Sequence, residues 1–68
     1  MKYIYGLSIS GKSILDFFYI NKIPFIAWDD SSQIRNDVRS IYNKIRFISP
    51  DKVDWETIKE AYVSPGID

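Results

Sequence analysis

The sequence contains neither cysteine nor histidine among its 68 residues. Their absence excludes disulfides, zinc sites of the cysteine–histidine kind, thiol nucleophiles and histidine general bases. The nine basic and nine acidic residues cancel, so the chain lacks the basic excess that nucleic-acid-binding proteins carry. We therefore expect no nucleic-acid partner and no metal site.

Long apolar runs are also missing. No stretch approaches the roughly 20 apolar residues that cross a bilayer, and Gly6 with its neighbouring serines interrupts the N-terminal run, which makes a poor signal peptide. We expect no membrane partner and a cytoplasmic location. Hydrophobic residues still make up 46% of the chain, which is enough for a core. A chain this short buries only about 60% of its unfolded surface, so we predict one domain of marginal stability.

Short apolar runs alternate with helical stretches along the whole chain. The pattern predicts strands at residues 3–5, 25–28, 47–48 and 61–64, helices at residues 10–22 and about 32–45, and a short helix after Asp54. This alternation predicts an α/β fold with a parallel sheet of about four strands and flanking helices. Right-handed crossovers give the strand order 3-2-1-4, with a ligand crevice between the first and fourth strands.

The segment GLSISGKS, residues 6–13, follows the first predicted strand and fits two motifs. One is the P-loop; the other is a Rossmann-type glycine loop in which Ser8 replaces the middle glycine. A loop that opens a helix presents unpaired N–H groups, which suit a phosphate or diphosphate. Gly6 allows the tight turn, Gly11 lets the helix pack closely, and Ser10 is expected to cap the helix and reach an anion. Alternatively, both glycines serve the turn and the packing and bind no ligand.

The P-loop interpretation is the weaker of the two. Its pattern fixes only four positions, and Leu7 and Ile9 are large where P-loops favour small residues. A P-loop lysine also works with a magnesium-binding acidic residue on a later strand, for which Asp29 is poorly placed. We therefore expect Lys12 to contribute little to ligand binding.

Two further segments are expected to lie beside the glycine loop. Asp29 follows Gly11 by 18 residues, close to the spacing at which an acidic side chain meets a ribose or a base edge. Asp29 can instead cap the second helix, a role open to Ser31 or Ser32 as well. The turn after the fourth strand, residues 64–66, is expected to face the glycine loop, although by itself it is a common strand-ending turn.

Three stretches together resemble the N-terminal domain of the Mur ligase family: YGLSISGKSILDFF, IPFIAWDDS and VDWETIKEAYVSPGI. The resemblance implies a Rossmann-like three-layer sandwich that holds the UDP part of the substrate. It places the diphosphate on the glycine loop, at the backbone amides of Ile9 and Ser10, and the uracil near the acidic end of the second strand. The implied UDP-binding residues are Gly6, Ser8, Ile9, Ser10, Gly11, Asp29, Asp30, Ser64 and Gly66. Ser8 departs from the family's usual glycine, which leaves the closeness of the diphosphate approach open.

The resemblance also implies an activity for the enzyme as a whole. The family member implied is an ATP-dependent ligase that adds D-glutamate to UDP-N-acetylmuramoyl-L-alanine in peptidoglycan synthesis. We expect its central and C-terminal domains to supply the ATP and magnesium sites, this segment to bind no cofactor, and residues 1–68 to be a fragment or a truncated gene product that cannot ligate alone. Two alternatives remain: a small module that binds NAD or another nucleotide, and a remnant that binds nothing.

Overall fold

Strands and helices alternate in the computed structural model, which describes residues 1–64. The two α-helices are α1 (Ile9–Ile20) and α2 (Ser32–Ile41). The three strands are β1 (Lys2–Tyr5), β2 (Phe25–Trp28) and β3 (Glu60–Val63), and two short 3₁₀ turns, η1 (Pro50–Lys52) and η2 (Trp55–Thr57), precede β3. The predicted α/β class is therefore confirmed.

The sheet has three parallel strands in the order β2-β1-β3, which corrects the prediction of four. The predicted strand at residues 47–48 is reduced to a single bridge between Phe47 and Ala27. Two backbone hydrogen bonds hold it, from the Ala27 N–H to the Arg46 carbonyl and from the Ile48 N–H to the Ala27 carbonyl, each 3.1 Å long. The chain then turns into η1 at Pro50, which leaves too little extended backbone for a strand. The bridge nevertheless lies on the free side of β2, away from β1, which is where the order 3-2-1-4 places the third strand.

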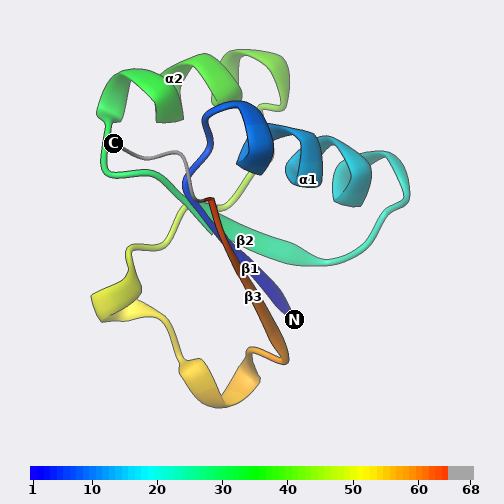
Figure 1. Ribbon diagram of the computed structural model, residues 1–68, viewed down its shortest axis with the longest axis vertical. Helices are drawn as coiled ribbons and strands as arrows, with labels where there is room; N and C mark the ends of the chain where they lie inside the picture. The colour runs from blue at the N-terminus through cyan, green and yellow to red at the C-terminus, as the bar shows by residue number, and fades with distance from the viewer. Residues whose placement is uncertain (65–68) are drawn as a thin grey trace.

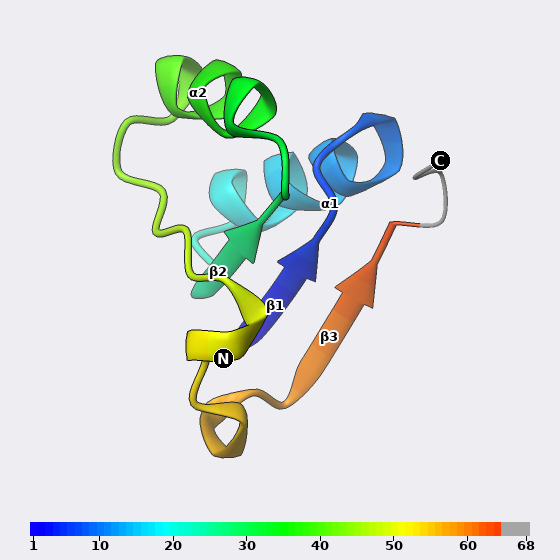
Figure 2. The same cartoon turned by 90° about the vertical axis from the view of Figure 1, so that its left-hand side faces the viewer.

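The two faces of the sheet are covered by different kinds of structure (Figures 1 and 2). Both α-helices lie on one face, and the 3₁₀ turns lie on the other. The helix side holds the larger apolar cluster, in which Ile4 of β1, Leu15 of α1 and Val38 of α2 are buried. The turn side holds a smaller cluster around Tyr3, Ile26 and Val53. A helix was predicted here after Asp54, but only the turn η2 forms.

The three strands point in the same direction, so their carboxyl ends meet at one edge of the sheet (Figure 2). Tyr5 pairs with Trp28 on one side and with Val63 on the other, and all three residues end their strands. The loops that follow β1, β2 and β3 therefore leave the sheet side by side. Within residues 1–64, neither helix has the length and apolar character needed to cross a lipid bilayer.

Candidate functional site

The glycine loop between β1 and α1 is closed tightly on itself. Gly6 has a φ of +96°, a conformation that L side chains rarely adopt. A Cβ atom on Gly11 would lie 1.6 Å from the carbonyl oxygen of Gly6, so the first turn of α1 packs directly on the backbone of the loop. The Gly6 N–H donates to the Trp28 carbonyl at 2.8 Å, which ties the loop to β2. The predicted turn and packing roles of the two glycines are thus present.

The N-terminus of α1 carries no cap from a side chain. Ser8 occupies the N-cap position, its side chain makes no capping hydrogen bond, and the first turn has no acidic residue. Among residues 1–64, the backbone N–H groups of Ile9, Ser10 and Gly11 find no acceptor, and Ser8, Ile9 and Ser10 are exposed. The expectation that Ser10 caps the helix is wrong, because α1 begins at Ile9 and Ser10 lies inside its first turn. These free N–H groups at the positive end of the helix suit an anion.

The start of α2 shows the contrasting arrangement. There the Ser31 hydroxyl accepts a hydrogen bond from the Ile34 N–H at 3.2 Å and caps the helix. One of the two serines named as alternatives to Asp29 therefore fills the capping role. The two helix N-termini lie at the same edge of the sheet, yet only that of α1 is left uncapped.

Asp29 braces the glycine loop against the segment that enters α2. Its Oδ2 accepts from the Leu7 N–H at 2.8 Å, and its Oδ1 accepts from the Ser31 N–H at 2.9 Å. The Arg35 guanidinium donates to the Asp29 carbonyl at 2.6 Å. The spacing identified Asp29 as a site residue but gave no sign of this bracing role, which depends on how two loops meet.

Asp30 is exposed and is held by two aromatic donors. Its Oδ2 accepts from the Tyr5 hydroxyl at 2.7 Å, and its Oδ1 accepts from the Trp28 indole at 2.9 Å. These two hydrogen bonds hold the pKa of the Asp30 carboxyl below its usual value, and the bond from Tyr5 has the larger effect. The Arg35 guanidinium lies 4.2 Å from the centre of a Trp28 ring, a stacking distance. The sequence analysis gave no role to Trp28, Tyr5 or Arg35 and so missed this cluster beside Asp30.

Ser64 brings the loop after β3 against the glycine loop. Its N–H donates to the Tyr5 carbonyl at 2.9 Å, and a Cβ on Gly6 would lie 2.8 Å from the Ser64 Cβ. Ser64 is only 4% exposed, and among residues 1–64 its hydroxyl has no hydrogen-bond partner. The predicted meeting of the two loops is present as far as Ser64, whereas Gly66 lies outside the described residues.

Lys12, which creates the P-loop match, is engaged away from the loop. Its ammonium lies 3.0 Å from both carboxylate oxygens of Asp16, one turn further along α1. The Tyr42 hydroxyl also donates to Asp16, at 2.7 Å, so this pair belongs to the contact between α1 and the end of α2. No group of three or more acidic side chains in residues 1–64 is arranged to hold a metal ion. The pairing of Lys12 with Asp16 does not support the P-loop interpretation.

A hollow of about 340 Å³ lies between α1 and α2 beside the glycine loop. Ser8 at the N-cap and Ile9 and Lys12 of α1 line one side, and Ile34 and Ile41 are among the residues that line it from α2. Ile9 is 86% exposed, so an apolar surface stands open next to the free N–H groups. The site therefore combines anion-binding amides with apolar surface, a carboxylate and an aromatic–arginine stack.

Comparison with known proteins identifies two relatives with the same name. UDP-N-acetylmuramoylalanine--D-glutamate ligase from Wolbachia sp. subsp. Brugia malayi (strain TRS) is 33% identical over 64 residues, and that from Wolbachia pipientis wMel is 28% identical over 64 residues. Each match covers 94% of this chain but only 13% of the relative, in its N-terminal region. No protein-family profile and no solved structure matches the chain. The resemblance to Mur ligases inferred from the motifs is confirmed by these relatives.

Proposed function

We propose that this chain is the N-terminal segment of an ATP-dependent ligase that adds D-glutamate to UDP-N-acetylmuramoyl-L-alanine, and that it holds the UDP part of that substrate. The observation that carries the proposal is the uncapped N-terminus of α1, which follows a glycine loop and faces the buried Ser64. The shared names and the coverage of the two relatives support the choice of ligase. The chain spans only 13% of their length, and we assign the ligation itself to the rest of the enzyme.

The diphosphate is placed at the first turn of α1. Ile9 and Ser10 are exposed residues whose backbone N–H groups have no acceptor in residues 1–64, and the dipole of α1 favours negative charge at this position. The tight packing of Gly11 on Gly6 keeps the helix N-terminus close to the sheet. Ser8 is exposed at the N-cap and uses no side-chain hydrogen bond there, so its hydroxyl is free to donate to a phosphate oxygen.

The two aspartates have different parts in this proposal. Asp29 has each carboxylate oxygen occupied by a backbone N–H, so its role is to fix the shape of the glycine loop. Each oxygen of Asp30 also accepts one hydrogen bond, but Asp30 is exposed, so a further donor can reach the remaining lone pairs. We therefore assign the hydrogen bond to the uracil edge to Asp30, with Trp28 and Arg35 beside it. Ser64 closes the opposite wall, and Gly66 is proposed for the same wall.

ATP and magnesium are proposed to bind in the remainder of the enzyme. Lys12 is paired with Asp16 and so is engaged away from the glycine loop, which supports the assignment of ATP to other domains. This segment would contribute by binding and orienting the nucleotide end of the substrate. It would thereby hold the reacting carboxylate in place for chemistry performed by other domains.

A matched pair of proline variants tests the diphosphate site. Proline is tolerated at the first position of a helix but lacks the N–H group. Ile9→Pro removes one proposed diphosphate donor from α1, and Ser32→Pro makes the same change at the start of α2. By calorimetry with UDP-N-acetylmuramoyl-L-alanine, we expect Ile9→Pro to weaken binding at least fivefold and Ser32→Pro to leave it within twofold. Equal affinities of the two folded variants would contradict the assignment of the diphosphate to the N-terminus of α1.

The alternative is a nucleotide-binding module that prefers NAD. Both functions use the free N–H groups of α1, so the ligand must distinguish them. The same titration with NAD and with UDP separates the two. Binding of NAD with no heat from UDP would replace the ligase proposal, whereas heat from UDP alone supports it. A folded chain that gives no heat with either nucleotide at millimolar concentration would favour a remnant that binds nothing.

A further inference from the structure

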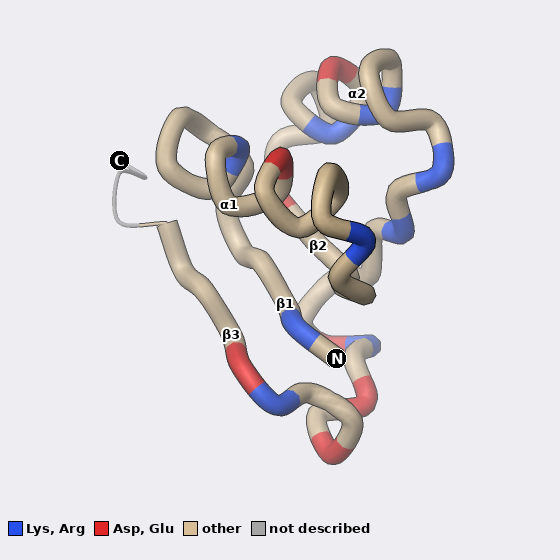
Figure 3. Tube along the Cα trace, turned by 90° about the vertical axis from the view of Figure 1, so that its right-hand side faces the viewer, with Lys and Arg blue, Asp and Glu red and all other residues tan. Residues whose placement is uncertain are grey.

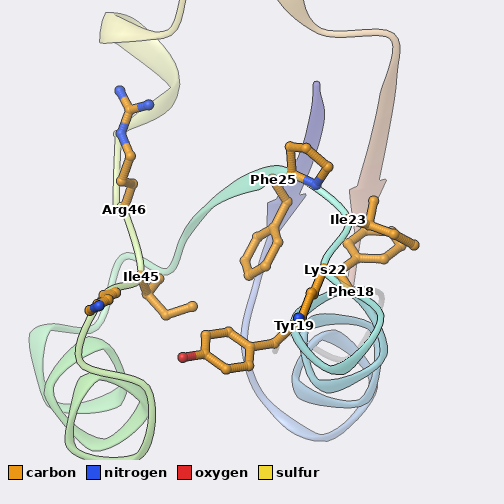
Figure 4. A pocket seen from close by; sticks show the side chains of 9 residues that line it. Phe18, Tyr19, Lys22, Ile23, Phe25, Ile45 and Arg46 are labelled. Carbon is orange, nitrogen blue, oxygen red and sulfur yellow. The ribbon is translucent and has the colours of Figure 1, made fainter.

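A second hollow, of about 420 Å³, lies at the opposite end of the sheet from the glycine loop (Figure 4). Its floor is apolar: Phe18 and Ile45 are buried, and Ile23 and Phe25 are half-buried. The side chains of Tyr19, Phe25 and Ile45 converge on this space in Figure 4. Phe25 begins β2, whereas the proposed UDP site follows the ends of the strands. The hollow is therefore a separate feature and does not rest on the proposed function.

The mouth of this hollow is basic. Lys22, Lys44 and Arg46 line it, all three are exposed, and no acidic residue is among the lining residues. Within residues 1–64 none of the three forms an ion pair, since the pairs found are Lys2–Glu60 and Lys12–Asp16. Figure 3 shows basic positions, and no acidic one, in the segment that follows α2. Arg46 lines the hollow, and in Figure 4 its guanidinium points away from the aromatic rings.

Backbone hydrogen bonds fix the chain segments that carry these cations. The Arg46 carbonyl accepts from the Ala27 N–H of β2 at 3.1 Å, which fixes the segment carrying Lys44 and Arg46. Lys22 follows α1 with a φ of +58°, a left-handed conformation usually filled by glycine. The Ile23 N–H donates to the Phe18 carbonyl at 2.9 Å and the Lys22 N–H to the Tyr19 carbonyl at 3.2 Å, so the helix end is closed by backbone groups. The Lys22 ammonium is not needed for this closure.

We propose that this hollow binds a single-chain amphiphile, with its hydrocarbon body on the floor and a phosphate or carboxylate head at the basic mouth. Cations at the mouth match an anionic head, and no acidic lining residue opposes it. The Tyr19 hydroxyl is the one uncharged polar side-chain group in the lining. A nucleobase would leave most of its donors and acceptors unpaired on such a floor, which favours a hydrocarbon over a nucleotide.

Amide chemical shifts of the ¹⁵N-labelled chain test this proposal. Octyl phosphate is the probe, and octanol, inorganic phosphate and UMP are the comparisons, all below the micelle concentration. We expect saturable shifts at residues 18–25 and 44–46, with octyl phosphate binding at least tenfold more tightly than octanol or phosphate. Absence of saturable shifts there, equal binding of octanol, or tighter binding of UMP at these residues would overturn the proposal.

Charge variants and vesicles supply the controls. Lys22→Gly removes a charge at a position where glycine suits the backbone, so loss of binding cannot be attributed to loss of the fold. Lys22→Gly with Lys44→Gln and Arg46→Gln should weaken octyl phosphate binding at least tenfold, while Lys52→Gln on η1 should leave it within twofold. Equal loss in the Lys52 variant, or binding to phosphatidylglycerol vesicles without binding to octyl phosphate, would contradict a site for a free amphiphile. Ile9→Pro should leave this binding unchanged, which separates it from the UDP site.

Discussion

A Cβ atom on Gly11 would lie 1.6 Å from the carbonyl oxygen of Gly6. This single approach couples the loop after β1 to the helix, because the loop backbone at Gly6 can meet α1 so closely only where α1 has no side chain. The same approach brings the uncapped helix N-terminus close to Ser64, whose Cβ would be 3.7 Å from a Cβ on Gly11. The geometry of the proposed diphosphate site is thus fixed by the packing of the fold.

Gly11→Ala is expected to destabilise the fold by about 3 kcal/mol or more, because the new methyl group collides with backbone that cannot rotate away. A chain of this size has only a few kcal/mol of stability, so the variant should be largely unfolded at 25 °C. Circular dichroism and the dispersion of amide resonances measure this. Ser10→Ala, at the neighbouring exposed position of the same helix, should change the free energy of unfolding by less than about 0.5 kcal/mol. A folded Gly11→Ala variant would show that the loop is looser than described.

Asp29→Ala should cost about 2 kcal/mol of stability, because it leaves the N–H groups of Leu7 and Ser31 without their acceptor. Leu7 is only 3% exposed, so water cannot readily replace the carboxylate there. Asp30→Ala, at an exposed carboxylate held by side chains, should cost clearly less. Urea unfolding of the two variants under the same conditions measures the difference. Equal losses would contradict the bracing role given to Asp29.

The proposed role of Asp30 can also be tested by measuring the affinity for the substrate. If Asp30 contacts the uracil, Asp30→Ala weakens the binding of UDP-N-acetylmuramoyl-L-alanine while the chain remains folded. Calorimetry on the variant and on the wild-type chain measures the two affinities. An unchanged affinity of the folded Asp30→Ala variant would contradict the assignment of the uracil contact to Asp30.

The stability of the chain should fall in alkaline solution because of Tyr3. Burial, with smaller contributions from Tyr5, Asp30 and Asp51, raises the pKa of Tyr3 from 10.0 to about 12. The folded state therefore retains the phenolic proton to higher pH than the unfolded state, so this contribution is complete below pH 10 and is lost between about pH 10 and 12. A difference of about two pKa units corresponds to roughly 3 kcal/mol.

Tyr3→Phe isolates this effect. At pH 7 the variant should be less stable by about 1 kcal/mol, because the Ile48 carbonyl loses the hydrogen bond from the Tyr3 hydroxyl, 2.8 Å long in the fold. Above pH 10 the wild-type chain should lose stability faster than the variant, so the two urea midpoints should converge. Parallel midpoints from pH 8 to 11.5 would show that Tyr3 ionises as easily in the folded chain as in the unfolded one.

Lys22→Gly should raise the free energy of unfolding by about 1 kcal/mol. Lys22 has a φ of +58° at the position where helices commonly end in glycine, and a side chain is strained in that conformation. Lys22→Ala keeps a Cβ and also loses the charge, so it should bring no comparable gain. Thermal unfolding of the two variants distinguishes the release of backbone strain from the removal of the positive charge. A gain in both variants would assign the effect to charge.

The sequence predicted the parts of this fold that depend on local pattern. The apolar runs located all three strands, and the helical pattern located α1 and α2. The third predicted strand does not form, because two apolar residues, Phe47 and Ile48, satisfy the pattern of a strand whether one bridge or several follow. The start of α1 was placed at Ser10 instead of Ile9, since serines at both positions 8 and 10 can serve as caps by type alone.

Within the candidate site, the sequence indicated which loops meet but not what their side chains do. The Gly6 turn, the closeness of Ser64 and the nearness of Asp29 follow from strand order and motif spacing. The bonds from Tyr5 and Trp28 to Asp30 depend on side-chain directions at the ends of two different strands, which no spacing reveals. The left-handed conformation of Lys22 was equally hidden, because a lysine at a helix end gives no sign of it.

Lys12→Ala should leave the binding of UDP-N-acetylmuramoyl-L-alanine within a few-fold of normal, although this lysine completes a P-loop pattern. Its ammonium is 3.0 Å from both Asp16 oxygens and 5.8 Å from the centre of the Tyr42 ring, so its charge is already engaged along the helix. The pair spans one turn of a half-exposed helix face and should contribute only about 0.3–0.5 kcal/mol to stability. Calorimetry on Lys12→Ala and Ile9→Pro shows whether the lysine ammonium or the backbone N–H of residue 9 contributes more to binding the diphosphate. A hundredfold loss in the lysine variant, about 2.7 kcal/mol, would assign the phosphate to Lys12 instead of the helix amides.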